Sequence, residues 1–207
     1  SVDLGAAAHI LNFKLYIMVG LPFEADEDID AIIDLTQRLR SYMDEKGCRG
    51  TLTLSVNPFV PKPFTPFQWM AAAEKKRMDA VMKRLTQALS RHKKIVVHFE
   101  SPKEARVQSI LARGDRRLGA PLMRAAMGRG AKDLVAEMRA DGLSAEDYLS
   151  PTWTEKTYLP WDHLDMGFSK HYLWQEYERA KKLLPTPICF DGCLRCGVCK
   201  PAERMTV

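Results

Sequence analysis

Residues 14–56 (KLYIMVGLPFEADEDIDAIIDLTQRLRSYMDEKGCRGTLTLSV) decide the fold of this chain. Residues 14–19 form a short apolar run of strand-forming residues that ends at Gly20-Leu21-Pro22. From Asp26 the apolar residues recur at helical spacing, acidic residues crowd the start, and Gly47 marks the end. Residues 51–56 then alternate as a second strand. Strand, helix and strand in this order predict a right-handed βαβ unit with parallel strands.

Residues 57–69 (NPFVPKPFTPFQW) form a loop unlike the rest of the chain. Its four prolines exclude a helix or a central strand, and its four aromatic residues are too many for a solvated linker. We therefore expect the loop to pack against the protein. Loops that follow the carboxyl ends of parallel strands line the sites of α/β proteins. The loop is accordingly either a wall over a ligand or a rigid Ω-loop that plugs a core.

The remaining pattern is mostly helical. Apolar spacing predicts a helix over 71–91, and residues 94–100 form a third strand. Residues 101–104 (SPKE) are a capping box that starts a helix ending near Gly114. The run Arg113–Arg117 after it is either an anion site or a salt-bridged surface corner. Short helices follow over 115–149, and a last helix over 169–184; the expected helix breaks are at Pro121, Gly128, Gly130 and Gly142.

Four of the five cysteines, Cys189, Cys193, Cys196 and Cys199, lie in the run CFDGCLRCGVC. Thiols this close together are typical of a metal or cluster site rather than of the disulfides of secreted domains. Structural zinc sites normally use two cysteine pairs that are far apart in sequence, whereas ferredoxins hold a cluster on closely spaced cysteines. The spacing favours an iron-sulfur cluster, and zinc or unligated thiols are the alternatives. Cys48 is expected to be a small buried hydrophobe.

Composition limits the classes of function. The chain has 207 residues, of which 46% are hydrophobic, and can bury a full core. No apolar run approaches about 18 residues, so we expect no transmembrane helix and no membrane partner. The cysteine usage and the lack of a secretory signal predict a reducing, cytoplasmic location. The net charge of +5 permits nucleic acid as a partner without arguing for it.

Several segments, taken in order, resemble one enzyme family. The strand end Tyr16–Glu24 (YIMVGLPFE), with the acidic helix start after it, resembles a segment late in the barrel of radical S-adenosylmethionine (SAM) enzymes. Residues 56–63, 113–117, 161–178 and 189–199 extend the likeness over nearly the whole chain. Together these segments resemble the radical SAM proteins that are linked to a B12-binding domain.

The resemblance includes one departure. Radical SAM catalysis uses a C-x3-C-x2-C triad on the first barrel loop, but here that spacing occurs near the C-terminus, at Cys189, Cys193 and Cys196, with Cys199 as a fourth ligand. We therefore expect an auxiliary 4Fe-4S cluster here, and a chain that is the C-terminal part of such an enzyme and inactive alone. The expected fold class is α/β. The last strands of a partial (β/α) barrel occupy 1–100, a helical extension 101–185 and a cluster-binding tail 186–207.

The resemblance also implies ligands and partners. SAM is the implied cofactor of the complete protein, and cobalamin is a further one. The residues expected to contact SAM or substrate are Met18, Val19, Gly20, Asn57, Pro58 and Phe59. The expected partners are the N-terminal half of the same protein, a small-molecule or RNA substrate, and further copies of the chain. No catalytic residue is predicted.

The cysteines alone fit a different class of function. A ferredoxin-like electron-transfer module would use them for a cluster, and a zinc-stapled module that binds RNA or protein would use them for structure. Neither would catalyse a reaction of its own. Metal content separates the two, because iron with sulfide indicates a cluster and zinc alone indicates a staple.

Overall fold

The computed structural model describes residues 2–128 and 133–199, which form two compact units. The first unit comprises Ser1–Val60 and Ala73–Arg106, and the second comprises Pro61–Ala72 and Val107–Val207. The predicted functional division at residues 100 and 185 stays a prediction, and residues 200–207 of the predicted tail lie outside the described residues. No helix in the described ranges has both the length and the apolarity needed to cross a membrane.

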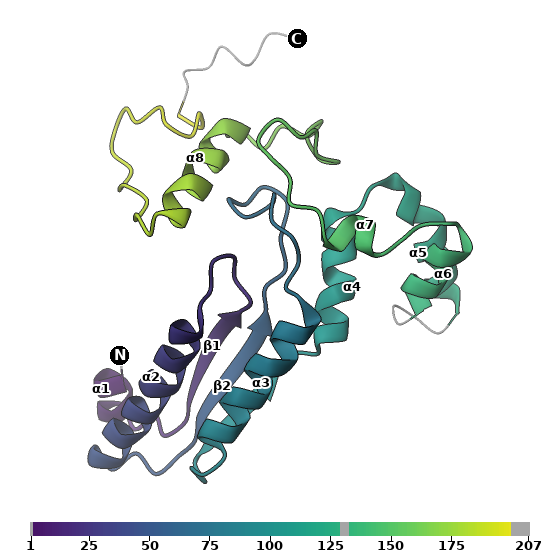
Figure 1. Cartoon of the computed structure of the whole chain (residues 1–207). Coiled ribbons are helices and arrows are strands. Elements are labelled where there is room, and N and C mark those ends of the chain that lie inside the picture. Colours follow the sequence, from purple (N-terminus) through teal and green to yellow (C-terminus); the bar gives the residue numbers. More distant parts are fainter. Residues whose placement is uncertain (1, 129–132, 200–207) are drawn as a thin grey trace. The chain divides into compact units, whose positions relative to one another are not determined.

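The first unit is built on three parallel strands in the order β1-β2-β3 (Figure 1). A short helix, α1 (Val2–Ala7), precedes β1 (Phe13–Val19), α2 (Asp26–Glu45), β2 (Leu52–Pro58), α3 (Lys75–Leu89) and β3 (Ile95–Phe99). The predicted strand-helix-strand unit and its parallel pairing are therefore confirmed. The mixed α/β class is confirmed as well, because these strands pack with several helices.

Helices α2 and α3 cover the same face of the sheet. The alternate residues Leu52, Leu54 and Val56 of β2 point to this face and are almost fully buried. They share one core cluster with Ile29 of α2 and Leu85 of α3. The consecutive strand order explains this arrangement, because two crossovers of the same hand that step in one direction place both helices on one side.

The opposite face of the sheet carries no helix of the first unit, as far as the structure describes it. Tyr16 is 73% exposed and Met18 is 52% exposed on this face. Parallel sheets are normally covered on both faces, so the exposure of this face is unusual. We call it the open sheet face; its residues are Lys14, Tyr16, Met18, Thr53, Ser55, Asn57, Val96 and His98.

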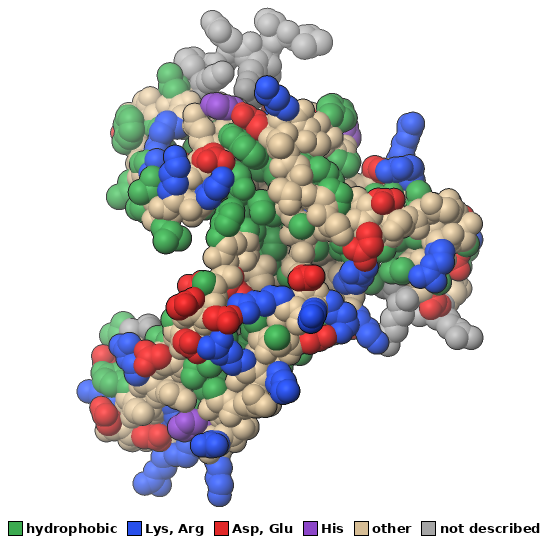
Figure 2. All heavy atoms as spheres, viewed as in Figure 1, with side chains coloured by type: hydrophobic (Ala, Val, Ile, Leu, Met, Phe, Trp, Pro, Cys, Tyr) green, Lys and Arg blue, Asp and Glu red, His purple; other side chains and the backbone are tan. Residues whose placement is uncertain are grey.

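The predicted helix over 71–91 begins later than expected, at Lys75. Residues 71–74 are not helical, and the N–H of Ala72 donates to the carbonyl of Leu149 at 2.9 Å. The outer sides of α2 and α3 are joined by the ion pairs Arg77–Asp26 and Arg84–Asp30. Figure 2 shows charges of both signs interspersed on the molecule's surface, which is typical of a solvated face.

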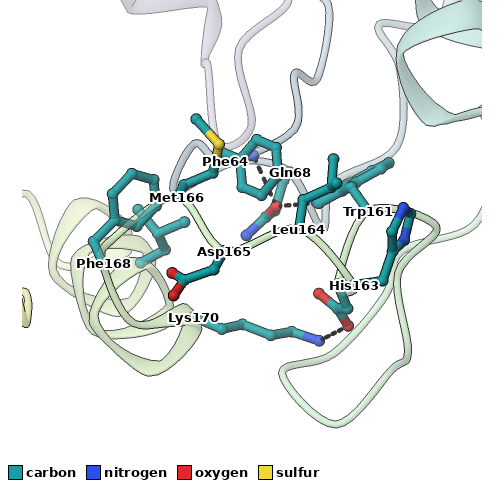
Figure 3. A pocket seen from close by; sticks show the side chains of 11 residues that line it. Phe64, Gln68, Trp161, His163, Leu164, Asp165, Met166, Phe168 and Lys170 are labelled. Atoms are coloured by element: carbon teal, nitrogen blue, oxygen red, sulfur yellow. Dashed lines mark hydrogen bonds and ion pairs between the residues drawn. The ribbon is translucent and has the colours of Figure 1, made fainter. Parts of the chain in front are cut away.

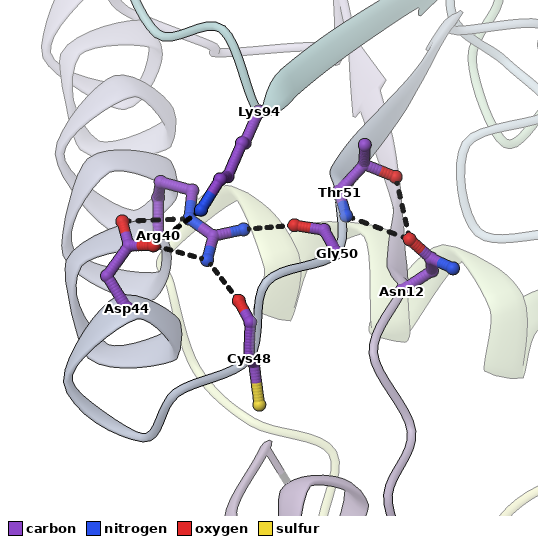
Figure 4. Close-up of polar contacts among 7 residues, drawn as sticks. All are labelled: Asn12, Arg40, Asp44, Cys48, Gly50, Thr51 and Lys94. Carbon is purple, nitrogen blue, oxygen red and sulfur yellow. Dashed lines mark hydrogen bonds and ion pairs between the residues drawn. The ribbon is translucent and has the colours of Figure 1, made fainter.

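A buried arginine ties the start of β2 to α2 (Figure 4). The Arg40 side chain is 4% exposed and donates to the carbonyls of Cys48 at 2.7 Å and Gly50 at 2.8 Å. It also forms a two-point ion pair with Asp44, which lowers the pKa of that carboxyl by hydrogen bonding. Cys48 itself is buried in the core and free, as predicted for a small hydrophobe.

The second unit is formed by helices and loops. Helix α4 (Pro102–Arg113) runs from the first unit into the second. It is followed by η1 (Arg116–Leu118), α5 (Gly119–Met127), α6 (Leu134–Ala140), α7 (Glu146–Leu149) and α8 (Lys170–Lys181). The first half of the predicted capping box is present, since the N–H of Glu104 donates to the Ser101 hydroxyl at 3.5 Å. The reciprocal bond to the Glu104 side chain stays a prediction.

The expected helix breaks are confirmed only in part. Gly128 and Gly142 follow the ends of α5 and α6, and Gly142 has a φ of +72°. Pro121 was predicted to break a helix but lies in the first turn of α5, where its missing N–H costs no helical bond. Gly130 lies outside the described residues.

The loop at residues 57–69, called here the proline-aromatic loop, packs against the protein as predicted, and it does so in two places. Phe59 is buried in the first unit, where its N–H donates to the Val19 carbonyl at 2.7 Å. Trp69 is fully buried in the second unit, in a cluster with Leu159, Trp161 and Tyr177. The loop therefore contributes to both cores.

Arg113 is the most buried cation of the second unit's described part. It is 1% exposed, lies 3.9 Å from the centre of the Trp153 ring and donates to the carbonyls of Met70, Leu149 and Pro151. Burial lowers its pKa to about 10, so it stays charged at neutral pH. The Arg113 guanidinium therefore donates to backbone carbonyls within the protein. Arg117, at the other end of the run Arg113–Arg117, forms an ion pair with Asp115 at the surface. The salt-bridge interpretation thus holds for Asp115 and Arg117 alone.

Candidate functional site

The carboxyl ends of β1 and β2 bring the predicted SAM-contacting residues together. Met18 pairs in register with Asn57, and Val19 pairs with Pro58. Phe59 follows directly and bonds to Val19 through the backbone. All six residues therefore lie side by side at one end of the sheet, because parallel strands present their carboxyl ends at the same edge.

These residues do not all present side chains to the same space. Val19, Pro58 and Phe59 are buried. Val19 belongs to the helix-covered core, so only its backbone is available to a ligand on the other face. Met18 and Asn57 lie on the open sheet face, and the Asn57 amide donates to the Ser55 carbonyl at 3.2 Å. A ligand at this strand end would meet Met18 and Asn57 first.

Gly20 begins a tight turn that only glycine fits. Its φ is +77°, and a Cβ at this position would lie 2.6 Å from the methyl carbon of Met78 and 2.8 Å from Cβ of Ala73. Its N–H donates to Oε2 of Glu24 at 2.7 Å. The turn therefore requires the positive φ of glycine, and the Glu24 carboxylate fixes it by accepting the Gly20 N–H.

Glu24 is a site residue whose role the sequence did not reveal. It lies outside α2, which begins at Asp26, and its side chain is only 7% exposed. Burial raises the pKa of this carboxyl, and the N–H groups of Gly20 and Leu21 and the charge of Arg77 partly offset the effect. Its Oε1 has no hydrogen bond among the described residues and lies 3.8 Å from Nη2 of Arg77. The spacing of a turn glycine and a glutamate four residues later was the available signal.

The cysteine run forms the second predicted site and lies in the second unit. Cys193 is buried, Cys196 is partly exposed, and Cys189 and Cys199 are exposed. All four thiols are free. The run is wrapped by turns at Gly192 and Gly197, whose φ values are +80° and +90°. The carbonyl of Cys196 accepts a hydrogen bond from the N–H of Ser169 at 2.8 Å, which anchors the run to the start of α8.

Arg195 organises the run and was not singled out from the sequence. It donates to the carbonyls of Pro187 and Ile188, both at 2.9 Å, and to Sγ of Cys193 at 3.2 Å. The hydrogen bond from Arg195 lowers the pKa of the Cys193 thiol, and the charge of Cys193 in turn raises the pKa of Cys189. Arg195 therefore favours the thiolate form of Cys193, which is the form that a metal requires.

The donor chemistry of the run fits a metal or cluster. Four free thiols lie within eleven residues, and two glycine turns wrap the run. Across residues 2–128 and 133–199, however, no three His, Cys, Asp or Glu side chains are arranged as a metal-binding group. Convergence of the four sulfurs on one centre stays a prediction.

Part of the chain is similar to a curated protein. An uncharacterized protein of Methanocaldococcus jannaschii is 34% identical over 120 residues, which are 57% of this chain and 24% of that protein. The chain thus matches about a quarter of the length of this relative. No protein family model matches the sequence. No solved structure matches it either.

Proposed function

We propose that this chain is the C-terminal part of a radical SAM enzyme that carries an auxiliary iron-sulfur cluster. The observation that carries the proposal is the winding of the first unit. Three parallel strands follow one another in sequence order, and both crossover helices lie on one face. A (β/α) barrel is wound in this way, with helices outside and the other sheet face turned inward. A doubly wound sheet would need helices on both faces.

The open sheet face is the surface that a barrel interior requires. It carries Tyr16, Met18, Ser55, Asn57 and His98, which are polar or partly polar side chains suited to a ligand-lined interior rather than a sealed core. In this proposal the N-terminal half of the same protein supplies the missing strands and pairs with the edges at β1 and β3. The match to only 24% of a longer relative is compatible with such an arrangement.

The turn at Gly20 would place SAM in this proposal. Backbone groups of Val19 and Gly20 line the strand end, the side chains of Met18 and Asn57 face the open side, and the buried Glu24 holds the turn. SAM would supply hydrogen abstraction, or methyl transfer when cobalamin is bound. The residues of this chain would bind and orient it, since the ligands of the SAM-cleaving cluster belong to another part of the protein.

Metal reconstitution tests the cysteine run. We expect the chain to take up iron and sulfide under anaerobic conditions, and each of the Cys→Ala variants at 189, 193, 196 and 199 to lose most of both. Cys48→Ala is the matched control, because that thiol is buried in the other unit and should not affect metal content. Uptake of zinc without sulfide would support the zinc-stapled binding module instead. Full metal retention by Cys199→Ala would refute four-cysteine ligation.

Activity tests the enzyme assignment. After reduction with dithionite, the chain alone should release no 5′-deoxyadenosine from SAM, whereas the longer protein that contains it should release it. Release by the chain alone would make the cysteine run the SAM-cleaving cluster and overturn the auxiliary role. Lack of release by a fully reconstituted longer protein would overturn the radical SAM assignment.

The open sheet face also predicts self-association of the chain. Exposed strand edges and apolar side chains such as Tyr16 and Met18 promote contacts between copies. Light scattering after size exclusion should show dimers or larger species that Met18→Glu reduces. A chain that stays monomeric at high concentration would argue against an exposed barrel interior.

A further inference from the structure

The second unit contains a pocket of about 440 Å³ in which side chains from two distant segments meet (Figure 3). Phe64 and Gln68 come from the proline-aromatic loop, and Trp161, Asp165, Phe168 and Lys170 come from the segment that leads into α8. This volume is within the range of ~300–1,000 Å³ that is typical of small-molecule pockets. The pocket uses neither the strand ends nor the cysteine run.

The orientation of the Gln68 amide is determined by its neighbours. Gln68 is 2% exposed, and its Oε1 accepts hydrogen bonds from Nε1–H of Trp161 at 2.7 Å and from the N–H of Phe64 at 3.0 Å. Both partners can only donate, so the oxygen must occupy this position. The Nε2 amide group is therefore turned away from them toward the pocket, as Figure 3 shows.

The amide donors of Gln68 are unused by the protein. Nε2 makes no hydrogen bond to any described residue. Nε2 is not one of the fully buried, unpartnered side-chain atoms among the described residues, so it is accessible from the pocket. Its two N–H donors are therefore available to an acceptor that occupies the pocket.

The charged groups of the pocket favour a ligand that also donates. Lys170 is engaged by Asp162 at 2.5 Å and by the Thr157 carbonyl at 2.7 Å, so its charge is balanced within the protein. The carboxylate of Asp165 is oriented by the N–H of Gly167 at 2.8 Å. With two carboxylates against one ammonium among the lining residues, the pocket disfavours phosphate and suits N–H donors.

Aromatic rings supply the walls. Phe64 and Phe168 meet edge to face with centroids 6.3 Å apart, and the Trp161 indole is locked by its bond to Gln68. Phe64 has a φ of +59°, an uncommon conformation for a bulky residue, and its N–H is held by the same amide. Planar ligands stack on or against rings that are held in this way.

We propose that this pocket binds a planar nitrogen heterocycle of the nucleobase type. Its edge would place an acceptor against the Gln68 amide and an N–H donor toward the Asp165 carboxylate, and its faces would contact Phe64, Trp161 and Phe168. The same chemistry is offered by a free nucleoside and by an unpaired base of RNA. The proposal is independent of the radical SAM assignment, because it needs neither metal nor the open sheet face.

Calorimetric titration of the metal-free 207-residue chain tests the proposal. Adenosine, cytidine, guanosine and uridine would be titrated separately, beside a short single-stranded RNA that contains all four bases. We expect at least one nucleoside or the RNA to bind. Tighter binding of the free nucleoside would identify a small-molecule site, and tighter binding of the RNA would identify an unpaired base as the ligand.

Gln68→Glu is the decisive variant. Glutamate keeps an oxygen for Trp161 and Phe64 but replaces the donor in the pocket with an acceptor, so affinity should fall about tenfold or more. Asp165→Asn, which keeps an oxygen for the Gly167 N–H, should weaken binding as well. Gln87→Glu, the same change at an exposed position of α3, is the matched control and should bind as the unmodified chain does.

A measurement on the unmodified chain guards against misfolding of the variant. On binding, the side-chain amide resonances of Gln68 should shift in a heteronuclear NMR spectrum, while those of Gln87 should stay in place. Absence of binding by every nucleoside and by the RNA at millimolar concentration would overturn the proposal and leave water as the occupant. Equal affinity of Gln68→Glu, or unchanged Gln68 resonances on binding, would also overturn it.

Discussion

Replacement of Arg113 by methionine should destabilise the second unit severely. Methionine approximates the length of the arginine stem but removes the guanidinium, which donates to the carbonyls of Met70 at 2.7 Å and Pro151 at 2.5 Å. Neither carbonyl has another hydrogen bond among those described. The carbonyl of Leu149 keeps a donor, because it also accepts from the N–H of Ala72.

The magnitude follows from these contacts. Two partly buried carbonyls without donors cost about 1–3 kcal/mol each, and the loss of the stacking on the Trp153 ring costs about 1 kcal/mol. Part of this is offset, because the buried charge disappears and the unpartnered Nε of Arg113 with it. The net loss in the free energy of unfolding is about 3 kcal/mol.

Urea unfolding followed by tryptophan fluorescence measures this loss selectively. All four tryptophans, at positions 69, 153, 161 and 174, lie in the second unit. With a slope of about 1.5 kcal/mol per molar urea, the midpoint should fall by about 2 M. Arg117→Met is the matched control, since its ion pair with Asp115 is at the surface and is worth less than about 1 kcal/mol. A shift below about 0.3 M for Arg113→Met, or equal shifts for the two variants, would refute the reasoning.

Three further predictions concern the first unit, followed by far-UV circular dichroism in urea. Arg40→Met should cost about 2–4 kcal/mol, because the buried carbonyl of Cys48 and the partly buried carbonyl of Gly50 lose their donor. Arg38→Met at an exposed pair should cost less than about 1 kcal/mol, and similar losses for the two variants would contradict this account. Gly20→Ala should cost more than Gly47→Ala, since both have positive φ but only Gly20 has side chains in the way of a Cβ; equal costs would show that sterics are irrelevant there. Glu24→Gln should remove a decline in the free energy of unfolding as pH rises above about 4.5. Burial raises the pKa of Glu24 in the folded state above its ordinary value of 4.5, so the folded state binds this proton more tightly than the unfolded state does. The same decline in Glu24→Gln would assign it to another group.

The elements of the first unit were predictable from the sequence because their signals are local. Apolar residues alternate in residues 51–56 and recur at helical spacing after Asp26, so each pattern shows both the type of element and its apolar side. The order strand, helix, strand then implies a parallel βαβ unit. The capping box at Ser101 is likewise a four-residue signal. The boundary at Lys75 was missed because residues 71–74 (AAAE) are strong helix formers, and no local pattern records that they are not helical here.

The candidate sites were predictable in composition but only partly in geometry. Register alone places Met18 beside Asn57, so the strand-end group follows from the strand prediction. Which of these side chains faces a ligand depends on the side that the helices cover, and this depends on the direction of successive crossovers. The role of Arg195 depends on how the cysteine run folds back on residues 187 and 188.

By itself, the sequence determined the parallel βαβ order, the packed aromatic loop and the close grouping of Cys189–Cys199, since each rests on residues near one another along the chain. Only the tertiary structure decided which polar groups are buried and which groups form hydrogen bonds with them. Gln68 bonds to Trp161 across 93 positions, and Arg113 bonds to Met70 across 43. Burial makes such bonds necessary, because an unpaired polar group away from water is costly. No periodic pattern along the chain encodes which distant group will satisfy them.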